Sequence, residues 1–255
     1  MPNQRLNFRL FCCIFLLIGM ALMLAGSVAG AAESDTFDDF DEFNEFEVAE
    51  SGESAPAFDP LSGYNRFMTQ VNDRMYFWAL KPVAEGYRFV IAEPVRVCIG
   101  NCFDNLGFPI RFVNNLLQLK AKPAGIEAAR FGMNITVGVL GLFDPAESWL
   151  KLHPRPEDFG QTLGHYGAGG GFHIVLPFFG PSNLRDTLGR VPDYFLDPLN
   201  YIDHWETRLA LDSLDVVNKT SLRIGQYEAL KKDAIDLYVF LRNAYEMKRT
   251  RDIKE

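Results

Sequence analysis

Residues 157–186 constrain the fold of this chain more than any other stretch. Five glycines fall between residues 164 and 171, and glycine permits backbone conformations and close approaches that side chains prevent. The apolar run that follows, 172–179, is too short to span a bilayer as a helix. Pro177 within it argues against a central strand, because proline cannot donate a hydrogen bond to a neighbouring strand. The stretch is therefore either a buried core segment or a segment that meets lipid.

The chain is rich in phenylalanine, with 22 among its 255 residues. So many aromatic side chains indicate either a large aromatic core or a surface that faces something apolar. The net charge of -8 arises in residues 32–59, which hold eleven acidic residues and no Lys or Arg. Without them and the two arginines of residues 1–31, 23 basic and 22 acidic residues remain. This remainder lacks the basic excess of a nucleic-acid-binding protein, so we set nucleic acid aside as a partner.

Residues 1–31 have the pattern of a secretory signal peptide, with two arginines, an apolar segment and a small-residue site at 29–31. We expect cleavage before Ala32. An uncleaved membrane anchor is the alternative, because the apolar segment is nearly long enough to span a bilayer. Cys12 and Cys13 lie within the apolar segment, so no lipobox cysteine is visible, which argues against a lipid anchor.

Residues 32–58 form an acidic tract in which phenylalanine recurs every third residue from Phe37 to Phe46. Runs of like charge usually remain disordered, so this composition predicts a tether. A helix that forms on binding a partner is the alternative, since the phenylalanines would then share one side. We expect the folded domain over residues 59–250, followed by a short C-terminal tail at 251–255.

The domain is predicted to be mostly helical, because apolar residues recur at spacings of three and four and no long alternating series of strands is present. The expected helices include 64–97, broken by Pro82 and Pro94; 105–119, pausing at Pro109; and 226–249. In the helix 105–119, Asn114, Asn115 and Gln118 form an uncharged polar face. Such a helix suits a membrane interface, although a core-facing helix has the same period. Residues 131–143 contain three glycines and are loose for a core helix.

Sequence motifs of catalysis or metal binding are missing. The chain has no G-x-S-x-G nucleophile motif, and its four histidines do not have H-E-x-x-H spacing. His165 and His173 flank the glycines, but metal sites normally bring further ligands. An apolar segment follows the glycines, whereas a P-loop would continue with Gly-Lys-Ser/Thr into a helix. We therefore expect neither an enzyme, nor a cofactor, nor a metal site.

Cys98 and Cys102 are the cysteines that would remain after cleavage. On a helix they lie one turn apart on the same face, and an exported compartment permits disulfides. A strained disulfide and two buried free thiols are both compatible with this spacing.

Two long motifs lie in the central stretch: FGQTLGHYG at 159–167 and LPFFGPSNLRD at 176–186. With shorter matches elsewhere, they resemble the MlaA/VacJ family of bacterial outer-membrane proteins over about residues 59–250. The matching motif residues include Asp59, Pro60, Asn65, Arg66, Phe159, Gly160, Gly180, Pro181, Arg185 and Asp186.

The resemblance implies a ring-like, membrane-associated helical domain with an irregular Gly/Pro-rich apolar segment. It also implies that the protein removes mislocalised phospholipid from the outer leaflet of the outer membrane and passes it to a soluble periplasmic carrier. The implied partners are phospholipid, a porin trimer, and that carrier with an inner-membrane ABC transporter. The implied location is the periplasmic side of the outer membrane. A scaffold or surface-spreading factor that moves no lipid is the alternative function.

A phospholipid that crosses a membrane needs a polar path for its headgroup, and charged side chains on that path would be costly within the bilayer. Irregular backbone at membrane depth is tolerated where it lines a wet cavity. We therefore expect the lipid path to be lined by Asn114, Asn115, Gln118, Gly167, Gly169, Gly170, Gly171, Phe172, Leu176 and Pro177.

Overall fold

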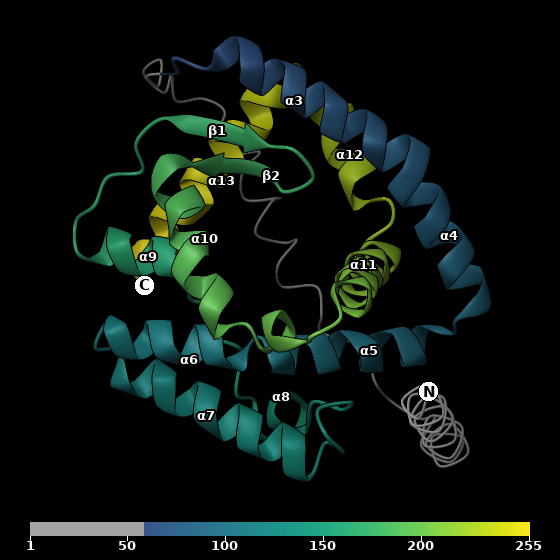
Figure 1. The fold of residues 1–255 in the computed structure, drawn as a ribbon, viewed down its shortest axis with the longest axis vertical. Helices are drawn as coiled ribbons and strands as arrows, with labels where there is room; N and C mark the ends of the chain where they lie inside the picture. Colours follow the sequence, from purple (N-terminus) through teal and green to yellow (C-terminus); the bar gives the residue numbers. More distant parts are fainter. Residues whose placement is uncertain (1–58) are drawn as a thin grey trace. The chain divides into compact units, whose positions relative to one another are not determined.

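A computed structural model describes residues 59–255, which belong to the compact unit Ser54–Glu255. The expected signal peptide and acidic tether lie outside the described residues. The described part is mostly helical, as predicted, with one two-stranded sheet (Figure 1). In chain order the elements are α3 (Ser62–Met75), η2 (Tyr76–Leu80), α4 (Lys81–Val90), α5 (Glu93–Leu106), α6 (Phe108–Leu117), α7 (Ala121–Thr136), α8 (Pro145–Leu150), α9 (Phe159–His165), β1 (His173–Leu176), β2 (Gly180–Asn183), α10 (Leu184–Leu196), η3 (Pro198–Tyr201), α11 (Trp205–Leu222), α12 (Gln226–Asp233) and α13 (Leu237–Lys254).

The first helical stretch continues through Pro82, where the sequence predicted a break. The π-helical turn η2 comes directly before α4, and its wider turn accommodates a proline that lacks an N–H. The true break is at Ile91 and Ala92, ahead of Pro94 in the first turn of α5. α3, η2 and α4 consequently form one continuous curve in Figure 1.

Contacts between helices close into a ring within this unit. α4 packs against α11, α11 packs against α5, and α5 leads to α6. α6 packs against α9, α9 packs against α13, and α13 returns to α3 (Figure 1). This arrangement agrees with the ring-like helical domain that the resemblance implied. None of the helices in residues 59–255 is both long enough and apolar enough to cross a membrane.

β1 and β2 form an antiparallel hairpin in which Leu176 pairs with Gly180. Pro177 lies in the connecting loop, so the apolar run contains an edge strand and a turn. This placement agrees with the expectation that proline excludes a central strand. The outer edge of β1 lies beside α3 (Figure 1).

The expected helix 226–249 is divided into α12 and α13. The division arises because Asp236 caps α13, accepting hydrogen bonds from the first backbone N–H groups of that helix. The same carboxylate pairs with Arg66 of α3 at 2.6 Å. The expected tail, 251–255, continues α13 through Lys254.

The loose segment 131–143 is half helix and half turn. α7 ends at Thr136, and Val139 and Leu140 follow with left-handed φ angles of 54° and 59°. Both side chains are exposed. The glycine-containing segment is therefore irregular after Thr136 and exposes apolar side chains. This agrees with the expectation that it is too loose for a core helix.

Candidate functional site

Residues 59–255 bury many polar side chains and expose many large apolar ones. The largest fully buried side chains are all polar: Glu127, Asn65, Asn114, Asn115, Asn134, Asn183, Asn218 and Ser182. Large apolar side chains are exposed instead, including Trp78 at 80% and Phe89 at 91%. Extended apolar surface on a soluble protein marks a site that meets lipid or another protein.

The two long sequence motifs meet where α9 crosses α10. Asp158 caps α9 by accepting from the N–H of Gln161, and Asn183 caps α10 in the same way. Gly160 and Gly189 face each other at the crossing, where a Cβ on Gly189 would lie 2.5 Å from the Gly160 nitrogen. Side chains larger than hydrogen would therefore force the two helices apart.

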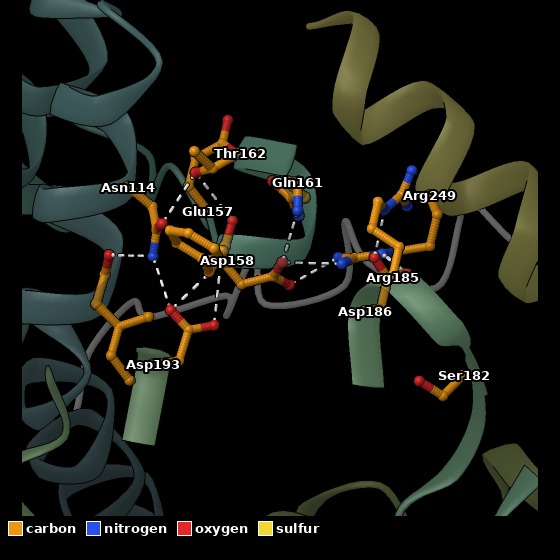
Figure 2. Close-up of polar contacts among 12 residues, drawn as sticks. Asn114, Glu157, Asp158, Gln161, Thr162, Ser182, Arg185, Asp186, Asp193 and Arg249 are labelled. Carbon is orange, nitrogen blue, oxygen red and sulfur yellow. Dashed lines mark hydrogen bonds and ion pairs between the residues drawn. The ribbon is translucent and has the colours of Figure 1, made fainter. Parts of the chain in front are cut away.

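Arg249 of α13 joins both helices at this crossing (Figure 2). Its terminal nitrogens donate to the two carboxylate oxygens of Asp158 at 2.7 and 2.8 Å, and its Nε donates to Asp186 at 2.8 Å. Arg185 and Tyr245 also donate to Asp186, at 2.9 and 2.6 Å. We call these five residues the arginine cluster.

The charges in the arginine cluster stabilise each other. Burial alone would raise the pKa of Asp186, but hydrogen bonds from Arg249 and Arg185 outweigh it and lower that pKa to about 2. Burial lowers the pKa of Arg249, whereas its two carboxylate partners raise it and prevail. The cluster thus joins α9, α10 and α13 through ion pairs.

A second polar joint lies between α6, α9 and α10. The Asn114 amide donates to Asp193 at 2.9 Å and accepts from the Thr162 hydroxyl at 2.9 Å. Asp193 also accepts from the backbone N–H of Phe159 at 3.0 Å, and burial raises its pKa. Figure 2 shows Asn114 and Asp193 on one side of Asp158, and Arg185, Asp186 and Arg249 on the other.

The three amides expected to line a lipid path are buried in this structure. Gln118 donates to Glu157 at 2.7 Å, and the same carboxylate pairs with Lys120 at 2.6 Å. Asn115 donates to the backbone oxygen of Arg155 at 3.2 Å. These amides thus lie inside the protein, where the side-chain oxygens of Asn115 and Gln118 have no hydrogen-bond partner. Their role in a lipid path stays a prediction.

The polar face of α6 points inward because it pairs with α9 and the segment before it. The side chains that α6 and the residues after it expose are apolar: Leu116, Leu117 and Leu119. The spacing of polar and apolar residues predicted the two faces of this helix but not which face points inward. A helix whose polar face is buried presents its apolar face to the surroundings, the reverse of a soluble surface helix.

The glycine segment after α9 is exposed at Gly167, Gly169 and Gly171. Gly167 and Gly171 have φ angles of 87° and 74°, which favour glycine. Gly170 is half-buried and accepts a hydrogen bond from the backbone of Arg185 at 3.1 Å. Of the other expected path residues, Phe172 and Leu176 are half-buried and Pro177 is exposed. Their role in a lipid path stays a prediction.

The N-terminal motif residues meet β1 and α13. Asn65 is fully buried and donates to Asp59 at 3.0 Å, and Asp59 accepts from the Tyr238 hydroxyl. Pro60 and Arg66 are exposed, and Gly180 and Pro181 begin β2. Most of the motif residues therefore build the joints of the fold.

The two cysteines are unbridged, and burial raises the pKa of both the Cys98 and the Cys102 thiols. His173 is buried, with its Nδ1 3.0 Å from Glu246, whereas His165 is exposed. Within the described part of the chain, His, Cys, Asp and Glu side chains form no group of three that would hold a metal ion.

An apolar stripe on α10 was missing from the sequence-based site. It consists of Leu184, Leu188, Val191 and Phe195, all exposed. Their spacing of four, three and four residues is helical, but Pro192 and the aromatic residues that follow obscured the helix. The opposite face of α10 carries the two carboxylates of the joints, the buried Asp186 and the half-buried Asp193.

Comparisons with known proteins agree with the motifs. A family model described as MlaA lipoprotein matches residues 57–252. A relative from Escherichia coli (strain K12), "Intermembrane phospholipid transport system lipoprotein MlaA", is 32% identical over 190 residues, covering 73% of this chain and 75% of the relative. An uncharacterized protein from Rickettsia bellii is 29% identical over 198 residues, or 77% of each chain.

The fold has a match among solved structures as well. A structure described as "Structural basis for maintenance of bacterial outer membrane lipid asymmetry" superposes with a TM-score of 0.65 and 30% sequence identity. The match covers 76% of this chain and 98% of the solved chain. With the family model spanning most of the chain, these matches identify it as a member of the MlaA lipoprotein family.

Proposed function

We propose that this chain transports phospholipid between membranes and so maintains the lipid asymmetry of the outer membrane. The observation that carries the proposal is the reversed distribution of side chains, with buried polar joints and exposed apolar faces. The family supports the same role, since the Escherichia coli relative is described as part of an intermembrane phospholipid transport system.

The apolar stripe on α10 suits the acyl chains of a phospholipid. Its exposed side chains extend over three helical turns, and the one exposed charged residue among them is Arg190. Acyl chains lose no hydrogen bonds against such a surface, and a guanidinium pairs with phosphate. The acidic residues of α10 do not oppose this, because they are held in the joints on its other face.

The proposed path differs from the one expected from the sequence. Apolar faces of α10 and α6 contact the acyl chains, and the exposed glycine segment 167–171 gives the headgroup access to backbone polar groups. Asn114, Asn115 and Gln118 act behind that surface, where they hold α6 against α9. Charged substitutions on the outward faces would be costly wherever they meet hydrocarbon.

In the proposed sequence of events, phospholipid leaves the outer leaflet of the outer membrane and passes to a soluble periplasmic carrier. The protein lies on the periplasmic side of that membrane, with a porin trimer as partner, and an inner-membrane ABC transporter acts with the carrier. The chain itself makes and breaks no covalent bond.

The test is the phospholipid content of the outer leaflet in a strain that lacks this chain. We expect surface-reactive phospholipid and detergent sensitivity to rise, and the intact chain to restore both. A normal outer leaflet in the deletion strain would contradict transport.

A scaffold or surface-spreading factor is the second candidate, favoured by the same exposed apolar faces, which also suit protein contacts. Deleting a scaffold should leave lipid asymmetry normal and change the recovery of its partner proteins. The deletion strain therefore separates the two functions.

A further inference from the structure

The hairpin β1–β2 ends in an exposed apolar tip, Pro177–Phe179. Phe178 and Phe179 are 79% and 70% exposed. Phe178 has a φ angle of 67°, a left-handed conformation that bulky residues rarely adopt. Residues 172–183 contain no Asp, Glu, Lys or Arg. A strained turn that exposes two large aromatic side chains indicates a site that binds another molecule.

The outer edge of β1 is covered by two asparagine side chains of α3. The Asn65 amide accepts from the N–H of Val175 at 2.8 Å and donates to the carbonyl of His173 at 3.0 Å. Asn72 repeats the pattern at the tip, accepting from Phe178 and donating to Leu176, both at 3.0 Å. Four backbone groups that a third strand would otherwise satisfy are thus satisfied by two amides.

The spacing explains why a helix can replace a strand here. Asn65 and Asn72 are seven residues apart, which is about 10.5 Å along a helix. The carbonyls that accept from them, on His173 and Leu176, are three residues apart on β1, which is about 10 Å along a strand. The N–H of Phe178 lies in the turn after β1. We call Asn65 and Asn72 the asparagine clip.

The asparagine clip pairs backbone groups that would be unfavourable in lipid if the strand edge were open. Unsatisfied N–H and C=O groups are excluded from the hydrocarbon region, since no water is present there to pair with them. Pro177 contributes no N–H, and Asn72 occupies the polar groups on either side of it. The Leu176 carbonyl and the Phe178 N–H can therefore leave water without losing their hydrogen bonds.

The charge beside the tip favours phospholipid. The Arg190 guanidinium of α10 lies 4.7 Å from the centre of the Phe179 ring. Arginine beside an aromatic ring can reach the phosphate of a headgroup while the ring lies among the first methylene groups. The contact also links the tip to α10, the helix that carries the apolar stripe.

We propose that Pro177–Phe179 inserts into a phospholipid bilayer, and that the asparagine clip makes this insertion possible by replacing a third strand. The proposal concerns membrane contact and is independent of lipid transport. It can hold in a chain that moves no lipid.

The test is flotation of the purified full-length chain with vesicles of phosphatidylethanolamine and phosphatidylglycerol. The double variant Phe178→Ser, Phe179→Ser should partition into vesicles at least about tenfold less than the wild type, because two large apolar side chains no longer leave water. Ile235→Ser is the matched control, since Ile235 is fully exposed but lies between Asp233 and Asp236. Its partition should change less than about twofold.

Asn72→Ala tests the asparagine clip separately, because it keeps both phenylalanines. We expect about tenfold weaker partition, since the Leu176 carbonyl and the Phe178 N–H would enter lipid unpaired. Hydrogen exchange should become faster at the Phe178 amide while exchange at the Val175 amide stays slow, which shows that the hairpin remains folded.

Three outcomes would overturn the proposal. Unchanged vesicle binding of the double variant would remove the tip as an insertion element. Unchanged binding of Asn72→Ala, with faster exchange at the Phe178 amide, would remove the asparagine clip. If the double variant only lost self-association in sedimentation and still bound vesicles, a second copy of the chain would be the partner.

Discussion

The two faces of α10 have opposite chemical character. The inward face carries Arg185 and Asp186 in the arginine cluster and Asp193 in the joint with Asn114. The outward face carries the apolar stripe that includes Leu188 and Phe195. Ion pairs on the inward face stabilise the fold, whereas the apolar side chains on the outward face are free to contact other molecules. Substitutions on the inward face should therefore change stability, and those on the outward face should change lipid contact.

The largest effect on stability is expected from Arg249→Met. It leaves the half-buried Asp158 without its cation and the buried Asp186 with Arg185 alone, which should lower the free energy of unfolding by about 3 kcal/mol. Urea unfolding in detergent, followed by circular dichroism, measures it. Arg74→Met on the exposed side of α3 is the control, and an equal loss there would show that any lost arginine destabilises the chain.

Leu188→Asp places a carboxylate in the apolar stripe on the outward face of α10. A carboxylate in contact with hydrocarbon costs about 2.5–3.5 kcal/mol, so phospholipid transport should fall to the level of the deletion strain. Outer-leaflet phospholipid in the complemented strain measures the loss, with Leu188→Met as the control that keeps it apolar. The unfolding free energy in detergent should stay within about 0.5 kcal/mol of the wild type, as for a surface substitution. Full transport by the aspartate variant would contradict a lipid-facing stripe.

The Asp186 carboxylate gives the inward face a defined pH dependence. Its pKa is about 2 in the folded chain and ordinary in the unfolded chain, so its stabilisation is present above about pH 4 and is lost as the pH falls toward 2. Asp186→Asn should cost about 2 kcal/mol at pH 7. The unfolding free energies of variant and wild type should converge below pH 4, and a constant difference would rule out ionisation as the cause.

Thr162→Val makes the smallest expected change. It removes the hydroxyl that donates to Asn114 and accepts from Gln118 while keeping the volume of the side chain. We expect a loss of about 1 kcal/mol and no change in lipid transport, measured by urea unfolding and by outer-leaflet labelling. A transport defect without a loss of stability would instead support the sequence-based prediction that the buried amides of α6 line the lipid path.

Much of the helical architecture followed from the sequence, because apolar spacing and proline positions are local signals. The polar face of α6 was predicted from Asn114, Asn115 and Gln118, and the structure contains it. Its inward direction was not predictable, since a period of 3.6 residues specifies two faces but not which one meets the protein.

The polar joints between the helices could not be predicted from local sequence patterns either. Arg249 lies 63 residues from Asp186 and 91 from Asp158, so their pairing depends on tertiary contacts. The motif residues Gly160 and Asp186 were found, but as matches to a family. Their physical reason, a close helix crossing with a buried ion pair, became visible only with the packing of α9 and α10.

The central claim is that outward faces meet lipid while inward faces meet protein, and photocrosslinking in cells tests it most directly. A photoreactive phenylalanine replaces Leu188 on the outward face of α10 in one strain and Asn115 on the inward face of α6 in another. We predict phospholipid adducts at position 188 and only internal protein crosslinks at position 115, identified by mass spectrometry. Lipid adducts at position 115 without any at position 188 would contradict the account.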